Sequence, residues 1–145
     1  MKQKNKHIFV FGIFAVDLSF YVDKKVKPGE TIIAKSSNIG PGGKASNQAI
    51  SARKLGASTT LITRLGTDNF NSSAHDIWRR EKLFASTTID KNLPTGMAGI
   101  FIDDKTGENS VIVDPGASAN LSITDFYLQK SKMKEGDIFL TQFEQ

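Results

Sequence analysis

Apolar and β-branched residues fall in several short, nearly uninterrupted runs along the chain. Ile8–Phe14 (IFVFGIF) and Asp137–Thr141 (DIFLT) are mostly apolar. Thr59–Arg64 (TTLITR) is rich in β-branched residues, and Thr87–Asp90 is a shorter segment of the same kind. Runs of this length are typical of strands that are covered on both faces of a sheet. We therefore predict strands at these four places.

Between these runs, apolar residues recur at helical spacing. Ala45–Leu55 repeats alanines every three or four residues and is followed by Gly56, a plausible helix stop. Phe70–Lys82 gathers its large apolar residues on one side, and Ser122–Met133 begins with a capping pattern. Strands that alternate with helices predict an α/β fold, with a mainly parallel sheet and flanking helices.

Four further segments are shorter and alternate between apolar and polar residues, which is typical of strands exposed on one face. The first pair flanks the turn signal Lys27-Pro28-Gly29-Glu30, and the second pair flanks a polar turn at residues 103–107. The four segments are Phe20–Val22, Thr31–Ser36, Met97–Ile102 and Val111–Asp114. We expect a second, smaller sheet attached to the parallel one, with strands near residues 18–40 and 97–114.

The composition of the 145 residues narrows the classes of function. The chain has no Cys, which excludes disulfides, a thiolate nucleophile and a Cys-ligated metal, and fits a reducing cytoplasm. No apolar run approaches the roughly 20 residues that a membrane helix needs. The net charge of +4 comes from scattered basic residues with no RNA-binding aromatic signature. We therefore expect neither a membrane nor a nucleic acid as partner.

Two sets of polar residues receive no functional role from their pattern. His7 and His75 lie far apart in the sequence, and neither is assigned a function. Asp103, Asp104, Glu108 and Asp114 form an acidic cluster, for which we predict a solvated hairpin rather than a metal site.

The segment Gly40-Pro41-Gly42-Gly43 lies just before the first predicted helix, and we predict a loop there. Lys44 and Ala45 follow it and complete a glycine-rich pattern. A P-loop would need a glycine in place of Asn38 and a hydroxyl in place of the alanine. The dinucleotide pattern G-x-G-x-x-[GA] matches literally, but the next predicted strand ends in Arg64 rather than in an acid. The remaining interpretation is a Gly-Gly turn at the N-terminus of a helix. The local pattern alone favours an ordinary helix start, and polyol binding by Lys44 and Asn47 is the alternative.

The rest of the sequence changes the balance between an ordinary helix start and polyol binding. Gly42–Ala49 (GGKASNQA) closely resembles the N-terminal signature of the ribokinase-like (PfkB-type) carbohydrate kinases. Further segments resemble other motifs of that family and occur in the family's order over essentially the whole chain. They are Gly12–Asp17, Pro28–Thr31, Leu65–Asp68, Thr95–Ile100, Gly116–Asn120 and Gln142–Glu144. The resemblance implies a ribokinase-like α/β fold whose small β-sheet acts as a lid.

The resemblance also implies an activity and a set of polar contacts. The family transfers the γ-phosphoryl group of ATP to a sugar or nucleoside hydroxyl, usually with Mg²⁺. By position, Asp17 should accept hydrogen bonds from sugar hydroxyls, and Glu144 should accept another. Lys44 and Asn47 should bind further hydroxyls. Charged acceptors form strong hydrogen bonds to hydroxyls and discriminate against ligands that lack them.

Four smaller residues complete the site that the resemblance implies. Gly42 and Gly43 should let the sugar approach the backbone, and Ala98 and Ile100 should line the lid side. The ribose-specific member that gives the family its name carries an Asn where this chain has Ala15. This difference argues against ribose itself and leaves another sugar as the expected substrate.

A second departure from the family concerns catalysis. The glycine-rich signature D-[TS]-x-G-A-G-D, which supplies the general base and an anion hole for the transferring phosphate, does not occur in the 145 residues. We therefore expect residues 1–145 to be the N-terminal half of a ribokinase-like domain, without the ATP-binding half and with neither a catalytic base nor a metal site. Phosphoryl transfer depends on positioning and electrostatic stabilisation, so this chain should be inactive alone.

Two alternatives to a truncated kinase remain open. One is a non-catalytic sugar-binding or assembly module, and the other is half of a split kinase. Truncation itself should leave the strand at residues 137–141 with an apolar face and an open sheet edge, which promote self-association. In the family the lid often pairs two subunits, so we also expect a homodimer.

Overall fold

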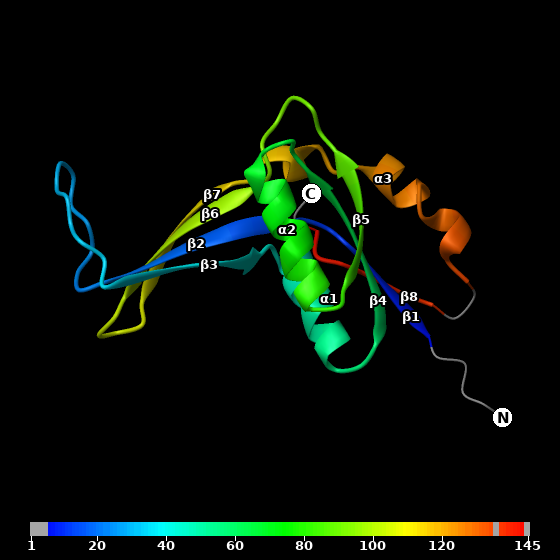
Figure 1. Ribbon diagram of the computed structural model, residues 1–145, viewed down its shortest axis with the longest axis horizontal. Helices are drawn as coiled ribbons and strands as arrows, with labels where there is room; N and C mark the ends of the chain where they lie inside the picture. Colours follow the sequence, from blue (N-terminus) through cyan, green and yellow to red (C-terminus); the bar gives the residue numbers. More distant parts are fainter. Residues whose placement is uncertain (1–5, 135–136, 144–145) are drawn as a thin grey trace.

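The computed structural model describes residues 6–134 and 137–143. Within these residues, the strands form two four-stranded sheets, and sheet B extends away from sheet A as a long arm (Figure 1). Sheet A is entirely parallel, with the order β5-β4-β1-β8. Its strands are β1 (His7–Phe11), β4 (Ser58–Leu65), β5 (Phe84–Ile89) and β8 (Ile138–Thr141).

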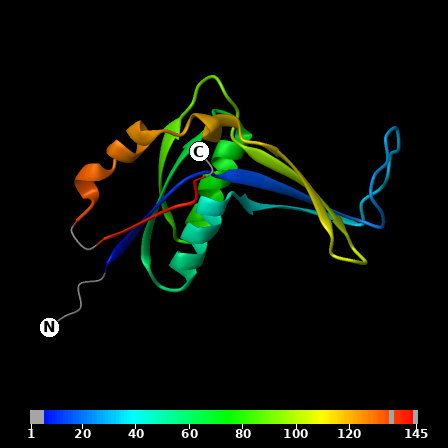
Figure 2. The ribbon, with the colours of Figure 1, turned by 180° about the vertical axis from the view of Figure 1, so that it is seen from behind.

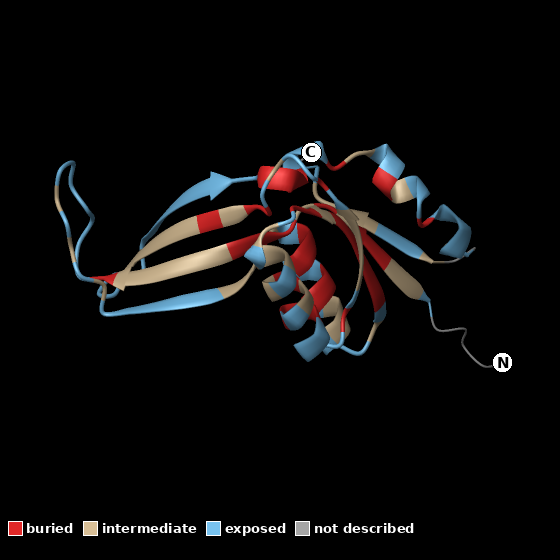
Figure 3. Cartoon of the chain, turned by 45° about the horizontal axis from the view of Figure 1, so that its top comes forward, coloured by how far each residue is buried: buried red, intermediate tan, exposed pale blue. Residues whose placement is uncertain are grey.

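Sheet B is mixed and has the order β3-β2-β6-β7. The central strands β2 and β6 are parallel, whereas the edge strands β3 and β7 pair antiparallel to them. Both edge strands are largely exposed, while the central pair is half-buried (Figure 3). The strands are β2 (Ala15–Val22), β3 (Ser36–Gly42), β6 (Met97–Asp103) and β7 (Asn109–Asp114).

Helices cover the two faces of sheet A unequally. On one face, α1 (Lys44–Lys54) and α2 (Asn69–Arg80) pack with Val10 of β1 in the hydrophobic core. The neighbouring residue Phe11 points to the other face, where its ring lies 6.3 Å from that of Phe126 in the short helix α3 (Ile123–Tyr127). Figure 2 shows the same arrangement from behind. Two 3₁₀ turns complete the elements, η1 (Gly116–Asn120) and η2 (Lys130–Lys132).

The fold class predicted from the sequence is confirmed, but the predicted strand over Ile8–Phe14 is wrong. β1 ends at Phe11, and the chain enters sheet B at Ala15. Gly12 lies at the break, and its amide still bonds to the Ile62 carbonyl at 3.2 Å before the chain turns away from sheet A. The apolar run is therefore continuous because both sheets bury it near their junction.

The predicted strand over Thr31–Ser36 is also wrong, because pairing begins at Ser36 and continues to Gly42. Residues 40–42 of the segment predicted as a loop therefore belong to β3, and Gly43 is the N-cap of α1. Pro41 lies opposite Val16 in this strand. A proline is tolerated there because β3 is an edge strand and needs fewer backbone donors than a central one.

The third difference concerns the helix predicted over Ser122–Met133. The capping box of Ser122 and Asp125 is present, but α3 ends at Tyr127. The amide of Gln129 then bonds to the carbonyl of Phe126, three residues back, which is a 3₁₀ bond rather than an α-helical one. In the described part of the chain, no helix is long and apolar enough to span a bilayer.

Candidate sugar-binding site

The predicted site residues lie where the two sheets meet, close to the first turn of α1. Asp17 is in β2, opposite Gly40 of β3 and Ala98 of β6. Paired residues on neighbouring strands point to the same face of a sheet. Ala98 and Ile100, two positions apart on β6, therefore share the face of Asp17.

Gly42 provides the space that the Asp17 carboxyl group occupies. A Cβ atom on Gly42 would lie 1.9 Å from the Asp17 Oδ1 atom. The carboxyl group thus rests directly over the bare backbone of β3, and burial raises the pKa of Asp17 above its ordinary value. The Asp17 side chain can therefore take this position only because residue 42, which lies 25 residues after it in the sequence, is a glycine.

Gly43 forms the junction between β3 and α1. Its φ of 82° is one that L side chains rarely adopt, and a Cβ atom would lie 2.5 Å from the Ile13 carbonyl oxygen. It is also the N-cap of α1, which has no side-chain cap. The first turn of a helix carries a positive partial charge, so this junction presents a polar, electropositive backbone next to Asp17.

Lys44 and Asn47 follow in the first turn of α1, and both are exposed. Because they are three residues apart, their side chains leave the helix on the same side. Glu144, the last predicted site residue, lies outside the described residues. The structure thus brings Asp17, Gly42, Gly43 and Ala98 together directly and places Lys44 and Asn47 on the adjoining turn.

Three residues that we did not predict as part of the site tie the end of β8 to α1. The Gln142 side-chain amide donates a hydrogen bond to Gln48 Oε1. A Cβ atom on Gly12 would lie 2.5 Å from Gln142 Oε1, so the Gln142 side chain fits against that glycine. All three residues belong to the quoted family motifs, but only the folded chain reveals their contact.

A hydrogen-bonded turn fixes where β6 begins. Asp68 caps α2 by accepting from the amides of Phe70 and Asn71, and its other oxygen accepts from the Thr95 amide at 2.5 Å. The Thr95 hydroxyl in turn accepts from the Gly66 amide at 3.1 Å. Since β6 starts two residues after Thr95, these bonds set the position of its inward-facing residues relative to the core.

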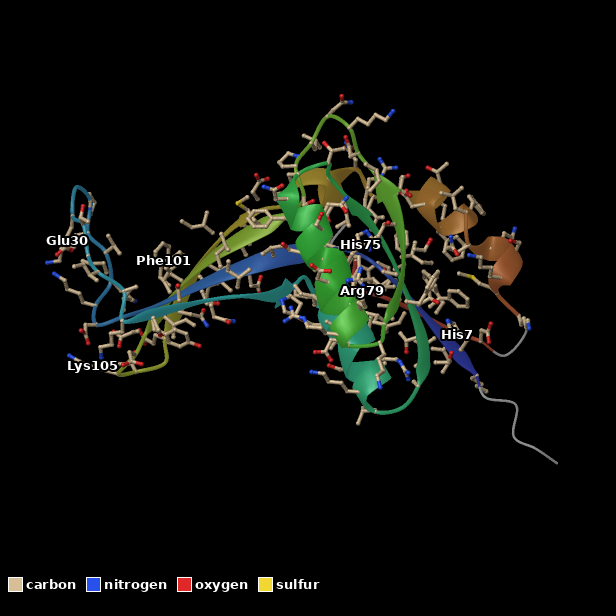
Figure 4. All side chains as sticks on the ribbon, in the orientation of Figure 1. His7, Glu30, His75, Arg79, Phe101 and Lys105 are labelled. Atoms are coloured by element: carbon tan, nitrogen blue, oxygen red, sulfur yellow. The ribbon has the colours of Figure 1, made fainter. Side chains whose placement is uncertain are left out.

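The polar residues without a predicted role all have structural partners. The His7 ring contacts the hydroxyls of Ser58 and Thr60 at 2.7 and 2.8 Å, at the opposite end of β1 from Gly12 (Figure 4). In the acidic hairpin, Asp103 accepts from two turn amides and Asp104 pairs with Lys35 at 2.8 Å. Within residues 6–134 and 137–143, no group of three or more acidic or histidine side chains could hold a metal ion.

The sequence and the fold are those of a family of kinases. The chain belongs to the pfkB family of carbohydrate kinases, whose profile matches residues 5–142. It is 34% identical over 139 residues to a ribokinase of Dictyostelium discoideum and 33% identical over 140 residues to a deoxyribokinase of Salmonella typhi. A solved ribokinase of Giardia lamblia, 26% identical, superimposes with a TM-score of 0.84.

These similarities cover nearly all of this chain but less than half of each relative. The alignments span 95% and 94% of this chain, against 43% of the Dictyostelium protein and 45% of the Salmonella protein. The superposition with the Giardia structure covers 96% of this chain and 42% of the Giardia chain. The chain therefore spans less than half the length of the relatives that it matches.

Proposed function

We propose that this chain carries the sugar-recognition side of a pfkB-family carbohydrate kinase. The observation that supports this most strongly is the Asp17 carboxyl group, which rests on the bare backbone of Gly42 beside the uncapped start of α1. In this proposal, Asp17 accepts hydrogen bonds from sugar hydroxyls while Lys44 and Asn47 contact further hydroxyls. Glu144 accepts one more.

The remaining contacts in this proposal are to the backbone and to apolar side chains. Gly42 and Gly43 admit the ring of the sugar to the backbone, and Ala98 and Ile100 form the wall on sheet B. Sheet B acts as the lid, and residues 1–145 form the N-terminal half of the kinase domain. The substrate is a sugar or a nucleoside, and a cytoplasmic location fits the absence of Cys.

For the chemical step, we propose that this chain alone binds the sugar without phosphorylating it. Kinases of this family use ATP, and phosphoryl transfer requires groups that position the phosphate and neutralise its developing charge. The glycine-rich signature that supplies these groups in the family does not occur in the 145 residues. The chain's own residues therefore orient the acceptor hydroxyl, and the ATP and Mg²⁺ sites lie outside this sequence.

Two measurements test this proposal. Calorimetric titration with ribose, 2-deoxyribose, fructose and adenosine should give saturable heat with at least one of them. A coupled assay of ADP release with the same compounds should show negligible turnover. No binding to any sugar or nucleoside would contradict the recognition role, whereas robust turnover would contradict the inactivity of the isolated chain.

Replacing Gly42 with alanine should weaken sugar binding about tenfold or more while the fold persists. The new methyl group displaces the Asp17 carboxyl group, which is the movable end of a side chain rather than backbone. Gly99→Ala is the matched control, because a Cβ atom there meets nothing within 4 Å on the neighbouring strand. Equal affinities of the two variants by calorimetry would contradict the assigned role of Gly42.

Sugar affinity should also fall as the pH is lowered. Burial raises the pKa of Asp17, and only the ionised carboxylate is purely an acceptor for hydroxyls. Binding is therefore strongest above this raised pKa and is lost as the pH falls through it. For folding the sign is opposite, because ionising a half-buried carboxyl group costs stability as the pH rises through the same pKa. Calorimetry at several pH values tests this, and Asp17→Asn should abolish the dependence.

A second candidate function is that of one half of a split kinase. The exposed apolar residues at the edge of sheet A support it. β8 is an edge strand, and Ile138 and Phe139 remain 45% and 49% exposed. Phe139 also lines a cavity of about 250 Å³ together with Phe11 and Phe143. Mixing this chain with the remaining C-terminal part of the Dictyostelium ribokinase should then restore ADP release. Sugar binding without turnover in the mixture would instead favour a non-catalytic module.

We also propose that sheet B pairs two copies of the chain. Its edge strand β7 exposes three consecutive apolar residues, Val111, Ile112 and Val113, at 50%, 69% and 55%. Ile112 also lines a cavity of about 440 Å³ with Phe101 on the same sheet. Light scattering should give the mass of a dimer, and Ile112→Lys should give a monomer. A wild-type monomer at high concentration would contradict this pairing.

A further inference from the structure

A third cavity, of about 540 Å³, lies at the end of sheet A opposite to the candidate sugar site. It opens at the amino ends of β1 and β4, between the ends of α1 and α2. Its walls are formed by Lys6, His7, Arg53, Lys82, Phe84 and the segment 56–60. The proposed sugar site lies at the other end of β1, so the two sites would act independently. The volume is within the usual range for small-molecule pockets.

Positive charge dominates the lining of this cavity. Lys6, Arg53 and Lys82 contribute three cationic side chains, and no carboxylate side chain is among the described residues that line it. The nearby Glu81 pairs instead with Lys54 at 3.3 Å. The ends of α1 and α2 each add roughly half a negative charge, which leaves the cavity with a positive balance.

The Arg53 guanidinium is held in place by neutral groups. Its Nε donates to the Lys82 carbonyl oxygen at 2.9 Å, and its Nη1 donates to that of Ala57 at 3.5 Å. These bonds fix the orientation of the side chain without neutralising its charge. A guanidinium has five N–H donors in a planar fork that matches the oxygen atoms of a phosphate group.

Lys82 occupies a backbone conformation that favours glycine. Both helices end in the same hydrogen-bonded motif. In α2 the amide of Leu83 bonds to the Trp78 carbonyl, and in α1 the amide of Ala57 bonds to the Ala52 carbonyl. The left-handed residue of the motif is Gly56 in α1, with φ 90°, but it is Lys82 in α2, with φ 52°. A lysine is thus kept at the cavity wall at a cost in backbone strain.

Phe84 supplies an apolar surface beside these cations. Its side chain is 59% exposed, and Lys132 Nζ lies 5.7 Å from the ring centroid. We propose that this cavity binds a small phosphorylated metabolite. The phosphate lies between Arg53 and Lys82, and the organic part lies against the Phe84 ring.

Amide NMR titrations with inorganic phosphate and with phenyl phosphate test this proposal. We expect saturable shifts at residues 56–60 and 82–84, with tighter binding of phenyl phosphate because of Phe84. Arg53→Gln should weaken binding about tenfold. Lys105→Gln, which removes an exposed lysine at the far end of sheet B, should leave binding unchanged (Figure 4).

Lys82→Gly separates binding from folding. Glycine suits φ 52°, so this variant should unfold at an equal or higher temperature while it binds phosphate about tenfold more weakly. Affinity equal to that of the wild type in this variant would overturn the proposal. So would wild-type shifts that do not saturate, or that appear at residues 42–47 instead.

Discussion

Replacing Gly43 with alanine should lower the free energy of unfolding by about 3 kcal/mol, one of the two largest effects that we expect. The φ of 82° costs an L residue roughly 1–2 kcal/mol. In addition, the new Cβ atom would lie 2.5 Å from the Ile13 carbonyl oxygen and 2.9 Å from Phe14 Cα, so backbone must move. Urea denaturation measures the loss through a lower midpoint.

Gly56→Ala is the matched control for this change. Its φ of 90° is similar, but a Cβ atom there meets nothing within 4 Å. The free energy of unfolding of Gly56→Ala should therefore fall only by the cost of the unfavourable φ, about 1 kcal/mol. If the two variants lose equal stability, the close contact between the start of α1 and the Ile13–Phe14 backbone does not determine the role of Gly43.

Replacing Asp17 with alanine should have the largest effect on ligand binding. A hydrogen bond to a charged group contributes roughly 1.5–3 kcal/mol, so loss of the carboxylate should weaken sugar binding about a hundredfold. Stability should be unchanged or slightly higher at neutral pH, because a half-buried carboxyl group with a raised pKa is removed. Calorimetry and thermal unfolding of the same sample measure both effects.

Asp23→Ala is the matched control for Asp17→Ala, because it also removes one negative charge close to β2. Asp23 is exposed, directly follows β2 and pairs with Lys35 at 2.8 Å, away from the candidate site. Its removal should leave sugar affinity unchanged. An Asp17→Ala variant that binds within twofold of the Asp23→Ala variant would show that Asp17 is not a sugar ligand.

The sequence pattern predicts most of the elements but not the transfer of the chain between sheets. The strand at Thr59–Arg64 and the helix at Ala45–Leu55 match β4 and α1 to within one residue at each end. In contrast, only residues 8–11 of the predicted strand Ile8–Phe14 lie in sheet A. Residues 12–14 form the connection to sheet B, where an apolar residue such as Phe14 is buried without being part of a strand. The periodicity of apolar residues indicates which positions are buried, but it does not identify the sheet that buries them.

The contacts of the candidate site were less accessible from the sequence. The family motifs name Asp17 and Gly42, but the close fit between them depends on the pairing of β2 with β3. The bond between Gln48 and Gln142 joins residues 94 positions apart, and no local pattern indicates it. Pairings of this kind are set by the whole fold, since register depends on which faces are buried.

The glycine-rich segment illustrates how the structure changes the meaning of a motif. Turn chemistry predicts a loop at Gly40–Gly43, yet Gly40 and Gly42 are paired residues of β3. Gly42 is needed for the space beside Asp17, while Gly43 alone provides the left-handed turn into α1. The two adjacent glycines therefore have different physical roles, which the variants above separate.

We propose above that a sugar binds where β2, β3 and the first turn of α1 meet. Amide NMR spectra recorded during a titration with the sugar that gives calorimetric heat test this claim most directly. We expect saturable shifts at Asp17, residues 42–47 and Ala98, and none at the amino ends of β1 and β4. Saturable shifts confined to other parts of the chain, with residues 42–47 unmoved, would contradict it.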